Sequence, residues 1–242
     1  MKNARSFAFA TLALLATAAQ AGPLELTVTD RDGKPAADVV VLVEAPNAPA
    51  PKPASAPVVI AQQDLKFSPF LTVVPLGSTL RFVNKDSYDH HVRSVPSGPL
   101  GSMPSVEYFE LRLDAASPPP ANSGGSYGGY DDYKPAATAP APKKSGKTWA
   151  EVKAEHAGPI GLGCHIHGSM RGQVYVSATP WFGKTDANGV VRIDGLPDAA
   201  TADVTIWHPD QLSDQAPVKV QLAPATTKAS AQLNFAPRRR RS

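Results

Sequence analysis

Cysteine is nearly absent from this chain: among 242 residues, Cys164 is the only one. A single thiol cannot close an internal disulfide. In an exported protein a lone thiol is either buried, paired between two chains, or held by a metal. The scarcity of cysteine therefore raises the prospect of a metal site before any motif is considered.

Long apolar runs are also scarce. The one such run covers residues 7–19, follows two basic residues, and ends in Ala19-Gln20-Ala21. It is too short to cross a bilayer, and its small-x-small ending suits cleavage after Ala21. The alternative, a first core helix, is disfavoured because Gly22-Pro23 follows at once. We therefore expect residues 1–21 to be a signal peptide and the mature protein to be periplasmic.

No strong excess of one charge is present. The formal charge is +3; it falls to about +1 without the two basic residues of the signal peptide, and to about −3 without Arg238–Arg241. A slightly acidic body argues against a nucleic-acid surface. The basic tail, 237–242, is expected to be a frayed terminus, with an acidic partner or a membrane as the alternative ligand. No Ser-His-Asp arrangement, carboxylate pair or phosphate loop stands out, so we expect no enzyme.

The patterned segments mostly alternate apolar and polar residues and end at Gly, Pro, Asn or Asp, which predicts an all-β protein, most simply β-sandwiches. The expected strands are Leu24–Val28, Val39–Val43, Phe70–Val74, Thr79–Val83, Phe109–Leu113, Gly172–Ser177, Val190–Ile193, Val204–Trp207, Val218–Leu222 and Ala231–Phe235. The Pro/Ala-rich residues 47–56 are expected to be an extended linker. Residues 115–148, rich in Pro, Gly, Ser and Ala, are expected to be a disordered loop. Thr148-Trp149-Ala150-Glu151 has the form of a helix capping box, although the residues after it alternate like a strand.

Metal-ligand chemistry is concentrated in "GCHIHGSM", residues 163–170. In a tight turn of about three residues per revolution, side chains three apart eclipse one another. Cys164, His167 and Met170 are therefore expected to converge while His165 points elsewhere. A fourth ligand has to come from a distant segment, and the candidates are His90 and His91.

A thiolate, two imidazoles and a thioether form a soft ligand set that suits one copper ion cycling between two oxidation states. Zinc would normally recruit a further cysteine, histidine or carboxylate rather than a methionine. A binuclear copper site needs two bridging cysteines. The alternative to a metal site is a structural free cysteine beside surface histidines.

At these residues the chain resembles the cupredoxins, the small blue-copper proteins, and among them the amicyanins and plastocyanins. The Cys-x-x-His-x-x-Met loop carries the resemblance, with Gly158 six residues before the cysteine and Met170-Arg171-Gly172 at the loop's end. Residues 77–84 also follow the family pattern, in which the ligand histidine comes six residues after the asparagine. The resemblance implies a Greek-key sandwich, a strand over Val152–His156, and a copper site of His90, Cys164, His167 and Met170.

His91 stands where most cupredoxins have an asparagine that ties the two ligand loops together. The resemblance makes it a candidate donor of a hydrogen bond to the Cys164 sulfur, and an exchange of roles with His90 is the alternative. The pairing of "HHV" with the cysteine loop is also similar to exported plastocyanin-like proteins often labelled methylamine utilisation proteins. The outer segments resemble the carboxypeptidase regulatory-like sandwich, an Ig-like fold, and Asn188-Gly189 is a hairpin turn signal.

The expected organisation is one sandwich inserted in, or fused to, another, with a single enlarged sandwich as the alternative. The expected parts are the signal peptide, 1–21; the first part of the regulatory-like sandwich, 22–46; the linker, 47–56; the cupredoxin domain, 57–178; the second part of the regulatory-like sandwich, 179–236; and the tail, 237–242. His208, near the end of the last part, is expected to be a packed residue rather than a ligand.

Such a site has no obvious open position for substrate, so the resemblance implies a periplasmic electron carrier with transient redox partner proteins. The partner is expected to dock around His167, on a surface of Gly168, Ser169, Pro99, Leu100 and Met103. Two alternatives remain: a copper-binding or trafficking protein that transfers no electrons, suggested by the extra His91 and His165, and a non-redox interaction module.

Overall fold

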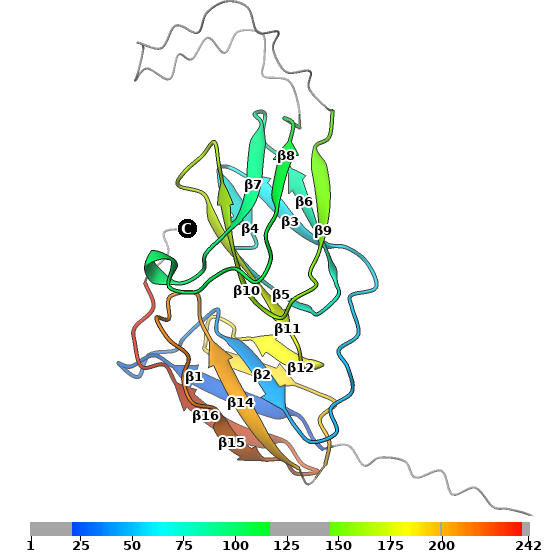
Figure 1. Cartoon of the computed structure of the whole chain (residues 1–242). Helices are drawn as coiled ribbons and strands as arrows, with labels where there is room; N and C mark the ends of the chain where they lie inside the picture. Colours follow the sequence, from blue (N-terminus) through cyan, green and yellow to red (C-terminus); the bar gives the residue numbers. More distant parts are fainter. Residues whose placement is uncertain (1–20, 117–145, 199, 239–242) are drawn as a thin grey trace, which may run out of the picture.

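A computed structural model of the chain describes residues 21–116, 146–198 and 200–238. In these ranges the protein is all-β, as the sequence predicts, with one short 3₁₀ turn, η1 (Pro99–Gly101). Nearly all of the expected signal peptide, most of the loop 115–148 and the tail beyond Arg238 lie outside the described residues. No helix within those ranges is long and apolar enough to cross a membrane. The strands form two sandwiches that follow one another along the long axis of the molecule (Figure 1).

The first sandwich carries the cysteine and both neighbouring histidines. One sheet has the order β5-β11-β10-β7-β8 and the other the order β4-β3-β6-β9. Their bounds are β5 (Leu71–Pro75), β11 (Arg171–Ser177), β10 (Gly158–Cys164), β7 (His90–Val95), β8 (Glu110–Leu113), β4 (Lys66–Ser68), β3 (Val58–Gln63), β6 (Thr79–Asn84) and β9 (Trp149–Lys153). Alternate residues of both sheets, such as Phe82, Ile160 and Leu162, fill the space between them. Each such side chain contributes about 1.5–3 kcal/mol by leaving water.

The second sandwich is built from both ends of the chain. One sheet has the order β13-β1-β16 and the other the order β12-β2-β14-β15. Their bounds are β13 (Val190–Ile193), β1 (Leu24–Thr29), β16 (Thr227–Gln232), β12 (Trp181–Lys184), β2 (Val40–Glu44), β14 (Thr201–Trp207) and β15 (Val218–Gln221). A separate hydrophobic core lies between these two sheets. The chain leaves this sandwich after β2 and re-enters it at β12, so the first sandwich lies within it in the sequence.

A third, smaller apolar cluster joins the two sandwiches. Val40 and Leu42 of β2 contact it, whereas Val41 and Val43 on the opposite face of the same strand belong to the second core. Because β2 is buried on both faces, its sequence is a continuous apolar run rather than an alternating one. Trp207 is central to the cluster, and its indole N–H lies 3.4 Å from the sulfur of Met103.

Two expected strands are displaced in the structure. β9 covers Trp149–Lys153 rather than Val152–His156, so a helix at the capping-box sequence is wrong. Here Ala150 pairs with Phe82 of β6, and backbone pairing outweighs the local capping signal. β16 covers Thr227–Gln232 rather than Ala231–Phe235, because parallel pairing with all six residues of β1 sets its bounds. Its small and polar residues carry little periodic signal.

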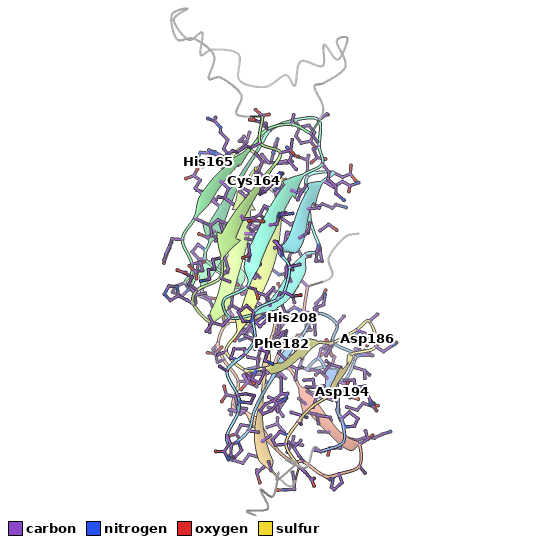
Figure 2. The ribbon with its side chains drawn as sticks, turned by 90° about the vertical axis from the view of Figure 1, so that its right-hand side faces the viewer. Cys164, His165, Phe182, Asp186, Asp194 and His208 are labelled. Carbon is purple, nitrogen blue, oxygen red and sulfur yellow. The ribbon has the colours of Figure 1, made fainter. Side chains whose placement is uncertain are left out.

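The described ends of the long loop meet near His90. Asp114 donates its backbone N–H to the carbonyl of Lys147, and the amide of Lys147 donates in turn to the Asp114 carboxylate. Ala116 donates to the carbonyl of Asp86, four residues before His90. The loop therefore leaves and rejoins the sandwich at the end that holds the candidate metal site, where Cys164 is labelled in Figure 2.

Candidate metal centre

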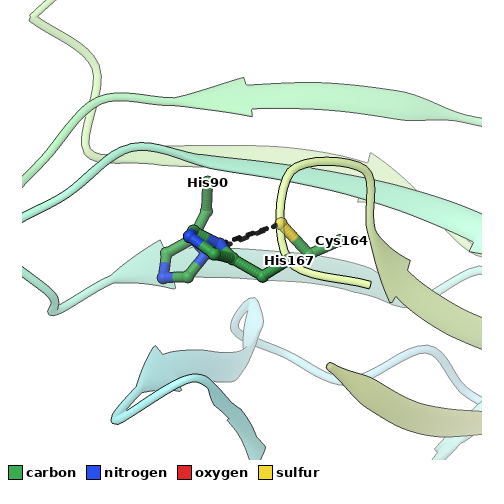
Figure 3. A group of neighbouring side chains, drawn as sticks. All are labelled: His90, Cys164 and His167. Carbon is green, nitrogen blue, oxygen red and sulfur yellow. Dashed lines mark hydrogen bonds between the residues drawn. The ribbon is translucent and has the colours of Figure 1, made fainter. Parts of the chain in front are cut away.

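Three side chains from separate parts of the first sandwich meet at one point (Figure 3). His90 begins β7, Cys164 ends the neighbouring β10, and His167 lies in the short loop that leads to β11. The Cys164 sulfur is 3.6 Å from Nδ1 of each histidine, and the two Nδ1 atoms are 3.2 Å apart. Among the described residues this is the group of histidine, cysteine and carboxylate side chains that is close enough to hold a metal ion.

The size of this triangle fits a first-row transition metal. A point in its plane lies about 2.0 Å from all three atoms, close to the 2.0–2.3 Å of metal–imidazole and metal–thiolate bonds. One soft sulfur and two imidazole nitrogens suit copper, whereas magnesium or calcium requires oxygen ligands. The donor set and its spacing therefore suit a transition-metal ion.

Two of the three side chains of the triangle are buried. His90 is fully buried and Cys164 is 2% exposed, while His167 is only partly buried. Met170 is also buried, in the same hydrophobic cluster as Cys164, and its backbone N–H donates to the carbonyl of His167. This bond closes the loop tightly after His167. Ligation by the Met170 sulfur stays a prediction.

A carboxylate fixes the orientation of the His90 ring. Nε2 of His90 lies 2.8 Å from Oδ2 of Asp86, so Nε2 carries the proton and Nδ1 faces the cysteine. The Asp86 carboxylate also accepts hydrogen bonds from the backbone amides of Asp64 and Leu65. Burial alone would raise the pKa of Asp86, but the bonds from His90 and these amides lower it below the ordinary value. Asp86 therefore stays ionised.

Asn84 holds the loop between β6 and His90 in shape. Its side-chain amide donates to the carbonyls of Tyr88 and Asp114, and its Oδ1 accepts from the amide of Asp86. The Tyr88 ring in turn packs edge-on against both His90 and His167, with centroids 5.3 Å away in each case. Sequence reasoning gave neither Asp86 nor Tyr88 a role, although a carboxylate four residues before a candidate ligand was a visible signal.

His91 reaches the cysteine through its backbone, not through its ring. Its amide nitrogen lies 3.4 Å from the Cys164 sulfur, and its carbonyl accepts from the amide of His165. The imidazole lies on the outer face of the sheet, with Nδ1 3.5 Å from a Glu110 carboxylate oxygen and the ring 5.7 Å from that of His165. The expected hydrogen bond to sulfur is thus made by the amide, and main-chain bonds join the two ligand loops.

Burial and the neighbouring His90 lower the pKa of His167, although Asp86 partly opposes this. A lowered pKa keeps this imidazole neutral near pH 7, with its lone pair free to bind a metal. Neutral histidine is the form that coordinates metal ions.

The surface expected around His167 is only partly present. Pro99, Leu100 and Gly168 line one groove beside the ligand loop, and Leu100 is fully exposed. Met103 does not belong there, because it packs in the junction cluster against Trp207. His208 is buried, its Nδ1 accepts from the Asp210 amide, and its ring packs against Phe235.

Several solved structures of copper proteins are similar to part of this chain. A reduced copper form of an amicyanin variant is 17% identical in sequence. The match covers 56% of this chain and 98% of the amicyanin chain, with a TM-score of 0.31. A purple cupredoxin from Nitrosopumilus maritimus has 18% identity, covering 50% and 99%, with a TM-score of 0.32. A copper-containing nitrite reductase from Thermus scotoductus SA-01 has 18% identity, covering 52% of this chain and 25% of its own, with a TM-score of 0.32.

No protein-family model matches the sequence, and a search of curated proteins finds no relative. The similarity to the solved structures covers about half of the chain at low identity. The choice of metal and the chemistry therefore rest on the geometry of His90, Cys164 and His167.

Proposed function

We propose that this chain is an exported, periplasmic protein that binds one copper ion and passes single electrons between redox partner proteins. His90, Cys164 and His167 would hold the ion, with Met170 as a further, weak ligand. The observation that carries the proposal is the buried, closely spaced triangle of one thiol and two imidazoles. A copper ion in such a site supplies a reversible one-electron couple. The proposal assigns the protein no catalytic turnover.

The residues around the triangle support electron transfer because their hydrogen bonds hold the ligand side chains in place. Asp86 fixes the His90 ring, and the His91 amide donates to the sulfur. A ligand set that is already oriented moves little when the charge of the ion changes. His167 is partly buried at the end of the sandwich, and a partner approaching there would lie closest to the ion.

The first test is the absorption of the purified protein on addition of cupric ion. We expect an intense visible band from a thiolate–copper bond, saturating at one equivalent, and Cys164→Ser should abolish it. His167→Ala should weaken or shift the band strongly, whereas His165→Ala, two residues away in the same loop, should leave it unchanged. Equal loss in the two histidine variants would contradict the proposed ligand set.

Copper delivery without electron transfer is the second candidate function. The observation in its favour is the outward pair of His91 and His165, whose rings are 5.7 Å apart next to the Glu110 carboxylate. Voltammetry separates the two functions. A reversible one-electron wave of the copper-loaded protein supports electron transfer. Bound copper with no reversible wave supports delivery.

A further inference from the structure

Two arginines flank a glycine on the outer face of the metal-binding sheet. In the register of the sheet, Gly163 on β10 pairs with Arg93 of β7 on one side and with Arg171 of β11 on the other. Paired residues share a face of the sheet, and neighbouring strands are about 4.8 Å apart. Arg93 and Arg171 therefore flank a position that has no side chain of its own. A Cβ on Gly163 would lie 3.2 Å from Cγ1 of Val95, which covers one side of this position, and 3.8 Å from Nη1 of Arg171.

The row of Arg93, Gly163 and Arg171 forms part of a groove of about 730 Å³, a volume typical of small-molecule sites. The groove runs from His165 and Gly168 at the ligand loop to Asp210 and Arg238 of the second sandwich. In Figure 1 the red C-terminal segment rises beside η1 (Pro99–Gly101). The exposed Leu100 of that turn and Phe70 give the groove an apolar border.

A second glycine of β10 brings the main chain of β7 close to this row. Gly161 of β10 also lines the outer face, and a Cβ there would lie 2.5 Å from the carbonyl oxygen of Val95. Main-chain atoms fill this space, so a larger residue cannot be accommodated without moving β7. Gly161 thus lets the neighbouring main chain pack closely against β10, whereas Gly163 borders the groove itself.

The groove carries uncompensated positive charge. No carboxylate in the described part of the chain forms an ion pair with Arg93; Glu110, opposite it on β8, approaches His91 instead. Arg171 donates through Nη1 to the carbonyls of Gly168 and Met170, and no carboxylate among the described residues forms an ion pair with it. Only Arg238 is neutralised, by Asp210 at 3.0 Å. Two positive charges thus border one space.

We propose that this groove binds a small organic oxyanion, a carboxylate or phosphate ester whose charged group lies between Arg93 and Arg171. The planar guanidinium fork matches both oxyanions with paired hydrogen bonds. The apolar body of the ligand lies against Leu100 and Phe70. Arg93, Gly163 and Arg171 lie on the face of β10 opposite the core, although Cys164 also borders the groove. The binding needs no bound metal and goes beyond the proposed electron-transfer function.

The test uses the purified full chain without metal and a fluorescent organic anion, 8-anilinonaphthalene-1-sulfonate, as the probe. We expect saturable binding, weakened about tenfold by Arg93→Gln and partly restored by Arg93→Lys, because losing a charge-assisted hydrogen bond costs this much. Arg31→Gln is the matched control: Arg31 is exposed in the second sandwich and pairs with Asp32. Equal affinity of Arg93→Gln and Arg31→Gln would overturn the proposal.

Competition identifies the class of ligand. Citrate and inorganic phosphate are added in separate titrations, each against sodium chloride at the same ionic strength, because salt alone screens exposed charges. Displacement by citrate at lower concentration assigns a carboxylate ligand, and displacement by phosphate assigns a phosphate ester. If neither displaces the probe better than chloride, the site is overturned. The two proposals can fail separately. If the protein binds the probe but shows no thiolate–copper band, the missing band refutes the copper proposal and the probe binding supports the anion site.

Discussion

At the scale of single residues, two adjacent histidines have different environments because a strand alternates its faces. His90 is fully buried beside the cysteine, and His91 lies on the outer face next to Glu110. The sequence suggested His90 only through the spacing of a resembling family; the residues themselves left both open. The register in which Cys164 pairs with Val92 places the His90 side chain in the core, and that register is a property of two distant segments.

Asp86 offers a sharp test at this scale. Its carboxylate accepts hydrogen bonds from Nε2 of His90 and from two backbone amides. An amide in its place presents donors where acceptors are required, so Asp86→Asn should loosen the His90 ring. Loss of such a partner typically lowers metal affinity by about 10- to 100-fold. Competition with a chelator of known copper affinity measures the change.

The control for this change is Asp64→Asn. It removes the same charge from the turn between β3 and β4, whose backbone amide bonds to Asp86. The control should bind copper as the unaltered protein does. Unchanged affinity in Asp86→Asn, or an equal loss in Asp64→Asn, would show that the carboxylate does not position His90.

At the scale of strands, the sequence predicted elements best where apolar residues alternate regularly. Thr79–Val83 was expected, and β6 covers Thr79–Asn84. β16 was misplaced because its alanines, serine and lysine give almost no pattern, and pairing with β1 defines it. The strand β4 was not expected at all, since three residues are too few to show a period. The β-propensity of single residues is a weak guide to a strand's bounds where pairing with neighbouring strands sets them.

Gly172 of β11 shows how tightly the two sheets of the first sandwich pack. A Cβ at this position would lie 2.8 Å from Cβ of Phe67, which is itself buried on β4. Gly172→Ala should therefore lower the free energy of unfolding of the metal-free protein by about 1–3 kcal/mol. Denaturant titration of the two proteins measures this difference in the free energy of unfolding.

Gly168→Ala is the matched change in the loop that precedes β11. A Cβ on Gly168 meets nothing within 4 Å, so its effect should stay within about 0.5 kcal/mol. A Gly172→Ala protein as stable as Gly168→Ala would mean that β4 moves freely away from β11.

At the scale of the whole molecule, the features that join distant segments were outside the reach of sequence reasoning. The row of Arg93, Gly163 and Arg171 exists only once three strands are in register. The junction is a similar case: the sequence placed Met103 on a docking surface, whereas Trp207 of the second sandwich packs against it. Linear patterns report which face of a strand is apolar, but not which partner covers it.

The junction gives the molecule a pH dependence that can be measured. Tyr175 packs against Trp207 with ring centroids 5.0 Å apart. Burial, and then the charges of Asp214 and Glu44 from the second sandwich, raise the pKa of Tyr175 to about 12. The folded protein therefore favours the neutral phenol, while the unfolded chain ionises near pH 10. The stabilisation is complete below pH 10 and is lost as the pH rises towards 12.

Between pH 10 and 12, the free energy of unfolding should fall in both the unaltered protein and Tyr175→Phe. The fall should be larger by about 2 kcal/mol in the unaltered protein, because a pKa difference of two units corresponds to that order of free energy. Denaturant midpoints at several pH values check this, and the comparison cancels the titration of lysines common to both proteins. Tyr108→Phe is the control, since Tyr108 is 82% exposed and should not alter the pH profile. If Tyr175→Phe and the unaltered protein lose stability in parallel, Tyr175 ionises as freely in the fold as in water, and the two sandwiches do not enclose it in solution.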